Sequence, residues 1–128
     1  MSKIVLDASA LLAVLNSEAG AEKLTPQLLS VATSSTVNLA EVQGKLVSRG
    51  IKPDEAWEAT ISPIREAAVF TDEQAKIAGS LIAQTSVFGL SLGDRACLAL
   101  GIALKAPVYT ADRLWKNLKL GIRIHVVR

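Results

Sequence analysis

Short apolar runs alternate along the chain with longer amphipathic stretches. The run from Lys3 to Leu6 is rich in β-branched residues, which predicts a buried strand. Further apolar runs predict strands at 31–34, 67–70, 107–110 and 122–127. Helical periodicity, together with N-capping residues and prolines at helix starts, predicts helices at 10–15, 21–30, 36–48, 53–64, 71–86 and 91–104, with a helical turn at 113–118.

This alternation of strands and helices is typical of one class of fold. Parallel strands need crossover connections, and helices in those connections cover both faces of the sheet. We therefore expect an α/β fold, a three-layer α/β/α sandwich with a central parallel sheet of about four to five strands. A length of 128 residues predicts a single domain over 1–128.

Four acidic residues interrupt apolar or glycine-rich segments. They are Asp7 in KIVLDASALLAVL, Glu41 in STVNLAEVQGKL, Asp94 in LSLGDRACLALG and Asp112 in VYTADRLW. Ionised carboxylates are rarely kept near a core without a partner. Four that met would repel one another unless a cation lay between them.

The predicted topology brings the four acids to one edge of the sheet. Asp7 and Asp112 directly follow predicted strands, and Glu41 and Asp94 lie in the first turns of predicted helices. In a parallel sheet the carboxyl ends of all strands share one edge, where ligands bind. Each acid also has a simpler interpretation as a helix cap or turn residue, and Ser91 with Asp94 matches a capping box.

Carboxylate oxygens are ligands for hard cations such as Mg²⁺ or Mn²⁺. With one histidine, His125, and one cysteine, Cys97, the chain offers no soft ligand cluster and little basis for a nucleophile–histidine pair. A cation held by carboxylates activates water and neutralises phosphate charge. Phosphodiester hydrolysis is therefore the leading chemistry.

Composition adds three expectations. The mean hydropathy of +0.35 is high for a small domain, which indicates a partner surface or contact with a second copy. If the four acids form one site, the other eight acids face 14 Lys and Arg, so the rest of the chain carries +6 and suits a polyanion. The lone cysteine fits a reducing, cytoplasmic setting, and no apolar run reaches the length of a membrane span.

The chain resembles PIN-domain ribonucleases, in the branch of VapC-type toxins of type II toxin–antitoxin systems. The resemblance rests on IVLDASALLAVL, SSTVNLAEVQGKL, DEQAKIAGSLIAQT, LSLGDRACLALG and APVYTADRLW, which follow one another in the family's order. It implies an endoribonuclease that requires Mg²⁺ or Mn²⁺, a homodimer, and inhibition by a small antitoxin that inserts into the acidic groove.

The resemblance also assigns residues. Asp7, Glu41, Asp94 and Asp112 correspond to the acidic quartet, as catalytic residues and metal ligands. Ser9 and Thr110 match the small hydroxyl positions beside the metal, and Asn38 falls at a polar position that varies within the family.

Basic residues near the motifs are candidates for RNA contact. Arg95 and Arg113 directly follow site acids, and Lys116 lies one turn further on. Lys45, Arg49 and Lys119 are further candidates for binding phosphate. For any single one of them, an ordinary solvated surface charge is the alternative.

Other functions remain open at this point. A non-catalytic module that binds RNA or protein would use the same fold as a scaffold. A phosphatase of the haloacid-dehalogenase type would want a second aspartate two residues after Asp7, where this chain has Ser9. A DNA-directed nuclease would use the same metal chemistry, because the residues do not show a preference for the 2′-hydroxyl.

Overall fold

Five short strands form one parallel sheet in the computed structural model, which describes residues 2–128. They are β1 (Ile4–Leu6), β2 (Ala32–Ser35), β3 (Glu66–Ala68), β4 (Val108–Thr110) and β5 (Ile124–Val126). The order across the sheet is β3-β2-β1-β4-β5, so β1 is central. On β1, Val5 lies opposite Thr33 of β2 and Val108 of β4. The predicted α/β fold with a parallel sheet of four to five strands is confirmed.

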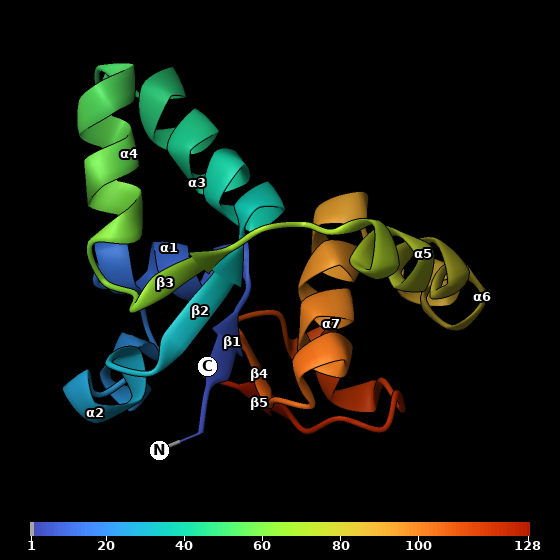
Figure 1. The fold of residues 1–128 in the computed structure, drawn as a ribbon. Helices are drawn as coiled ribbons and strands as arrows, with labels where there is room; N and C mark the ends of the chain where they lie inside the picture. Colours follow the sequence, from blue (N-terminus) through green and yellow to red (C-terminus); the bar gives the residue numbers. More distant parts are fainter. Residues whose placement is uncertain (1) are drawn as a thin grey trace.

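Helical segments connect each strand to the next (Figure 1). Their bounds are α1 (Ala8–Leu15), α2 (Pro26–Leu29), α3 (Thr36–Ser48), α4 (Pro53–Ile61), α5 (Asp72–Ser80), α6 (Ile82–Thr85) and α7 (Leu92–Leu104). Short 3₁₀ segments lie at Ala21–Lys23, Ser86–Phe88 and Arg113–Asn117.

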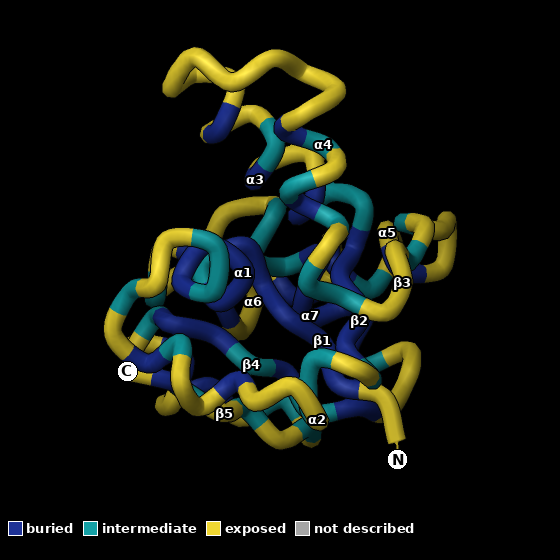
Figure 2. The backbone as a smooth tube through the Cα atoms, turned by 90° about the vertical axis from the view of Figure 1, so that its left-hand side faces the viewer, coloured by how far each residue is buried: buried dark blue, intermediate teal, exposed yellow. Residues whose placement is uncertain are grey.

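The central strand β1 shows why the sheet is covered on both faces. Its residues are all buried, and alternate side chains point to opposite faces. Val5 packs with Leu98 of α7, whereas Ile4 and Leu6 pack with Ala10 of α1. Figure 2 shows β1, α1 and much of α7 as the buried centre of the molecule. The layers are therefore those of a three-layer sandwich.

A third apolar cluster joins α1 to the pair of helices α3 and α4. Leu11 of α1 contacts Leu39 and Val42 of α3 within this cluster, and Trp57 of α4 packs against it half-buried. In Figure 1 the two helices rise side by side above the end of the sheet, and α3 starts at the carboxyl end of β2. The first turns of α3 are thereby held against the site described below.

Two predicted helices are shorter or broken in the structure. The prediction of one helix over 21–30 is wrong, because Pro26 starts a new helix, α2, whose N-cap is Thr25. The prediction of one helix over 71–86 is also wrong. There α5 ends at Ser80, whose hydroxyl donates to the carbonyl of Ile77, and α6 follows.

None of the helices in residues 2–128 combines the length and the apolar character that crossing a membrane requires.

Candidate functional site

The order of the strands creates a crevice at the centre of the sheet. From β1 the chain crosses to β2 on one side, and later returns to place β4 on the other side. Ligands in open parallel sheets bind outside the carboxyl ends of the strands at such a reversal. Asp7 directly follows β1, and Asp112 lies two residues beyond β4. The topology therefore places both carboxylates at the reversal point.

A hollow of about 380 Å³ opens at this point, and all four predicted carboxylates line it. They come from four separate segments of the chain: the end of β1, the exposed face of α3, the first turn of α7 and the loop after β4. Its lining residues are Asp7, Ala8, Ser9, Leu12, Asn16, Glu18, Glu41, Lys45, Arg49, Asp94, Asp112 and Arg128.

Asp7 is the buried member of the set, with 3% of its surface exposed. It is the N-cap of α1, and its Oδ1 accepts a hydrogen bond from the backbone N–H of Ala10 at 2.7 Å. Its Oδ2 accepts from the Thr110 hydroxyl at 2.6 Å, and the Ser9 hydroxyl lies within 2.9 Å of both oxygens. Ser9 in turn accepts from the N–H of Ala111 at 2.9 Å, which ties α1 to the loop after β4.

Burial raises the pKa of Asp7 from 3.8 to about 6, because the ionised form loses its hydration. Hydrogen bonds from Thr110, Ala10 and Ser9 oppose this rise, and the negative charge of Asp94 adds to it. A carboxylate held in this state gains from a bound cation, which would replace the lost hydration.

Asp94 and Asp112 each act as a capping residue and still face the hollow. Asp94 Oδ2 accepts from the N–H of Ser91 at 2.9 Å, and the Ser91 hydroxyl accepts from the N–H of Asp94. Asp112 Oδ1 accepts from the N–H of Leu114 at 3.0 Å. In each case the capping bond uses one carboxylate oxygen, so the second remains for a ligand. Capping and ligand binding are therefore compatible at both residues.

Glu41 reaches the hollow by packing against the first turn of α7. A Cβ atom added at Gly93 would lie 2.5 Å from Oε1 of Glu41, so only glycine permits this approach. One turn earlier on α3, the buried amide of Asn38 donates to the carbonyl of Gly93 at 2.9 Å, while its Oδ1 has no partner in residues 2–128. The start of α3, which carries Glu41, is therefore hydrogen-bonded to the first turn of α7, which carries Asp94.

The pKa of the Cys97 thiol is affected by three of these carboxylates. Its pKa lies well above the usual value, first because the side chain is fully buried in α7. The charges of Asp7, Asp94 and Glu41 raise that pKa further. A thiol that stays protonated is a poor nucleophile, so cysteine chemistry finds no support in this geometry.

The four carboxylates surround a hollow and do not form a closed cage. Within residues 2–128, no three side chains of His, Cys, Asp or Glu lie close enough together to hold a metal ion in a preformed cluster. Mg²⁺ needs no such cluster, because it keeps several waters and takes only one or two carboxylates directly. An all-oxygen set around one buried carboxylate therefore fits Mg²⁺ or Mn²⁺.

Of the basic residues predicted to contact RNA, Lys45 and Arg49 line the hollow, whereas Arg95, Arg113 and Lys116 do not. Arg95 turns toward α5, where its Nη1 donates to the carbonyl of Ala78 at 2.9 Å. Its Nε is buried, so this placement argues against an RNA contact by Arg95. Arg113 and Lys116 are exposed, and neither is among the residues that line the hollow.

Sequence reasoning missed the rim that the C-terminus builds. Arg128 donates to Glu18 at 2.7 Å, and Asn16 donates to the same glutamate at 3.1 Å. The C-terminal segment reaches this position by packing against Gly20, where an added Cβ would lie 2.3 Å from the carbonyl oxygen of Val127. The sequence signal for this contact is Gly20 itself, because glycine readily adopts the left-handed φ of 95° found there.

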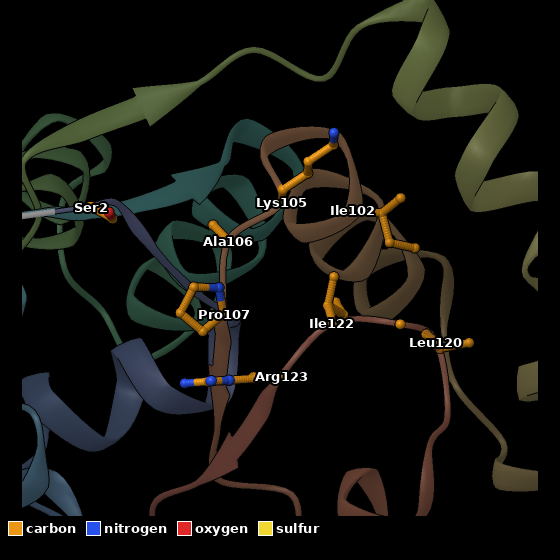
Figure 3. Close-up of a pocket in the computed structure, with 9 residues that line it drawn as sticks. Ser2, Ile102, Lys105, Ala106, Pro107, Leu120, Ile122 and Arg123 are labelled. Atoms are coloured by element: carbon orange, nitrogen blue, oxygen red, sulfur yellow. The ribbon is translucent and has the colours of Figure 1, made fainter.

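A larger cavity, of about 600 Å³, lies at the opposite edge of the sheet (Figure 3). It opens where β4 and β5 begin, between the end of α7 and the segment that leads into β5. Ile102, Leu120 and Ile122 give it an apolar lining, and Lys105 and Arg123 are its charged members. Since no carboxylate lines it, the smaller acidic hollow is the candidate site.

We expect Gly93→Ala to weaken the site without weakening the fold. The added methyl group would meet the end of the flexible Glu41 side chain, which can rotate away at little cost. Alanine also has the higher helix propensity, so stability should change by less than about 1 kcal/mol. Mn²⁺ affinity, measured by electron paramagnetic resonance, should fall because Glu41 is displaced.

The matched control is Gly79→Ala in α5, where an added Cβ would meet nothing within 4 Å. This variant gains the same helix propensity and leaves Mn²⁺ affinity unchanged. Equal Mn²⁺ affinity in wild type and Gly93→Ala would show that the contact between Glu41 and Gly93 has no part in the site.

Comparisons with known proteins identify the family and the fold. The PIN domain model matches residues 4–120. Among solved structures, DNA-bound VapBC from Salmonella typhimurium is 19% identical, with both chains fully covered and a TM-score of 0.75. VapC20 of Mycobacterium tuberculosis, a toxin that cleaves the sarcin–ricin loop, is 19% identical with a TM-score of 0.74, covering 94% of this chain and 99% of that chain.

VapBC2 from Rickettsia felis, bound to a promoter DNA fragment, is also 19% identical, with 98% of each chain covered and a TM-score of 0.73. A comparison with curated proteins finds no match. At these identities the solved structures establish the fold, whereas the domain model spans most of the chain. The carboxylates at the strand reversal thus lie on a known scaffold, and the chain belongs to the PIN domain family.

Proposed function

We propose that this chain is a VapC-type toxin, an endoribonuclease that hydrolyses RNA phosphodiester bonds with Mg²⁺ or Mn²⁺ in the cytoplasm. One observation carries the proposal: carboxylates from four separate segments line a single hollow at the strand reversal. Capping roles explain Asp7, Asp94 and Asp112 one at a time, but they do not explain why all four acids line one open hollow.

The proposal gives the four carboxylates roles in binding the metal and in orienting water. Asp7, Asp94 and Asp112 would hold the metal, directly or through its waters, and Glu41 would either join them or orient the attacking water. A bound divalent cation supplies the activation of water and the neutralisation of phosphate charge. The hydroxyls of Ser9 and Thr110 hold the Asp7 carboxylate in place.

The proposal also includes two protein partners, an antitoxin and a second copy of the chain. The similar structures from Salmonella typhimurium and Rickettsia felis are VapBC assemblies, which favours a small antitoxin as the inhibitor of this chain. A homodimer is the proposed assembly, and the exposed side chains of Ile82, Val87 and Leu92 offer apolar surface for it. The single-domain organisation over 1–128 remains part of this proposal.

We expect purified wild type to cut a mixed pool of structured RNAs when Mg²⁺ or Mn²⁺ is present, and to stop when EDTA is added. Asp7→Asn should leave the RNA intact in every condition. Single-stranded and duplex DNA of matched sequence, run in parallel, report the preference for the sugar.

Absence of cutting by wild type, combined with demonstrated Mn²⁺ binding, would replace the nuclease with a module that binds RNA or protein. Equal cutting by wild type and Asp7→Asn would show that the activity does not come from this site.

A further inference from the structure

One exposed stripe of α3 leads away from the carboxylates. Glu41, Lys45 and Arg49 follow one another at intervals of four residues, and all three are exposed and line the acidic hollow. Side chains four residues apart lie above one another on a helix, and each step rises about 6 Å. Arg49 is the C-cap of α3 and continues the row, because its φ of −93° and ψ of 6° stay close to helical values.

Neither basic side chain of this stripe forms an ion pair in the described part of the chain, although, after the hydrogen bond from Asn16, the charge of Arg49 helps to lower the pKa of Glu18. The ion pairs there are Lys3 with Glu66 and Arg128 with Glu18. The third basic residue of the hollow, Arg128, is therefore already occupied by Glu18. The hollow thus has a carboxylate end and, beside it on α3, two positive charges available to an anion.

This arrangement fits an extended strand of phosphates. A step of about 6 Å along the helix is comparable to the separation of successive phosphates in an extended nucleic acid. The hollow, at about 380 Å³, is in the range of small-molecule sites, a size that suits one nucleotide of a single strand. No aromatic side chain is among its lining residues within 2–128, so binding there would rely on the backbone.

We propose that α3 sets the path of the substrate: Lys45 and Arg49 bind successive backbone phosphates of single-stranded RNA, on one side of the phosphate that lies at the carboxylates. The proposal rests on the proposed nuclease function and adds the strand path to it. It also selects Lys45 and Arg49 over Arg95, Arg113 and Lys116, because only the first two line the hollow. At the carboxylates themselves, the strand is repelled unless a cation is bound there.

Salt dependence of binding tests this path. A fluorescent oligouridylate is titrated with the full chain in EDTA, from 50 to 400 mM salt, and a gel checks that the RNA stays intact. The slope of log K against log salt is negative, and each lost phosphate contact on a single strand should make it less steep by about 0.7. We therefore expect Lys45→Gln and Arg49→Gln each to reduce the steepness of that slope by about 0.7 and to weaken binding about fourfold at 0.15 M salt.

Two matched variants keep this result specific. Lys76→Gln changes an exposed lysine of α5 outside the hollow, and Arg113→Gln changes the rival candidate beside Asp112. Both should leave the slope as in wild type. Unchanged slopes in Lys45→Gln and Arg49→Gln, or an equal loss in Lys76→Gln or Arg113→Gln, would overturn the proposed path.

Three further outcomes separate this proposal from others. If poly-glutamate of matched charge binds as tightly as RNA with the same dependence on Lys45 and Arg49, an acidic protein partner replaces RNA on α3. If the slopes become less steep as expected but no RNA is cut with Mg²⁺ or Mn²⁺, the proposed strand path is supported and the proposed nuclease function is wrong. If RNA is cut but the slopes of the two variants match wild type, the nuclease function is supported and the strand path is wrong.

Discussion

Asp7→Asn is expected to abolish cleavage and, at neutral pH, to make the fold more stable. In the native state the pKa of Asp7 is about 6, against 3.8 as the ordinary value. A difference of about 2 pKa units corresponds to about 3 kcal/mol between the two protonation states. Wild type bears this cost whenever Asp7 is ionised, and an amide, which does not ionise, avoids it.

The direction of the pH dependence follows from proton binding. Between pH 4 and pH 6 the native state binds more protons than the unfolded state, so the stability of wild type falls as pH rises. The contribution of Asp7 is fully present below pH 3.8 and is lost above about pH 6. The free energy of unfolding of Asp7→Asn, relative to wild type, should therefore increase by up to about 3 kcal/mol from pH 4 to pH 8.

The neighbours of Asp7 can accept this change. The Asn carbonyl can replace Oδ1 as acceptor for the N–H of Ala10, and the new NH₂ can donate to Thr110, whose hydroxyl lies 3.2 Å from that of Ser9 and can turn toward it. Urea unfolding at a series of pH values gives the measurement, with Asp54→Asn on the exposed surface of α4 as control. A constant loss of stability at every pH would contradict the prediction.

Added Mg²⁺ should reverse the order of stability. A ligand that binds only the native state stabilises it by RT ln(1 + [L]/Kd), about 1.4 kcal/mol for each tenfold excess over Kd. Wild type at pH 8 should therefore gain stability with Mg²⁺, whereas Asp7→Asn should not. A gain of stability with Mg²⁺ in wild type alone would show that the ionised Asp7, which destabilises the fold, is needed for the proposed metal binding.

The sequence predicts the scaffold well because local and global signals agree. The run IVL before Asp7, buried on both faces, and the alternation of strands with helices are sufficient for a parallel sheet covered by helices. Pro26 and the hydroxyl of Ser80 mark the places where helical periodicity alone is misleading. No local sequence pattern predicts the order of the strands, although this order creates the reversal point at which the carboxylates lie.

Contacts between distant elements were beyond prediction for the same reason. The approach of Glu41 to Gly93 depends on how α3 packs on α7, and the turn of Arg95 toward Ala78 depends on the position of α5. Proximity in sequence to a site acid made Arg95 and Arg113 attractive candidates. Lys45 and Arg49 were also candidates, and helical geometry places these two at the hollow, because they share the face of Glu41.

Asp94 allows the capping role and the proposed metal role to be separated by two variants. Asp94→Asn keeps a carbonyl that can accept from the N–H of Ser91, so the cap survives and stability should change by less than about 1 kcal/mol. Its charge is lost, and cleavage should fall at least about a hundredfold, equivalent to about 2.7 kcal/mol of transition-state stabilisation. Mn²⁺ affinity should fall in parallel.

Ser91→Ala is the reciprocal change. It removes the hydroxyl that accepts from the N–H of Asp94 at 3.1 Å, which should cost about 1 kcal/mol of stability, while cleavage stays near the wild-type rate. Unfolding and single-turnover cleavage, measured on both variants, therefore give opposite patterns if Asp94 has both roles. If Asp94→Asn cuts RNA like wild type, Asp94 is a capping residue only, and the site reduces to Asp7, Glu41 and Asp112.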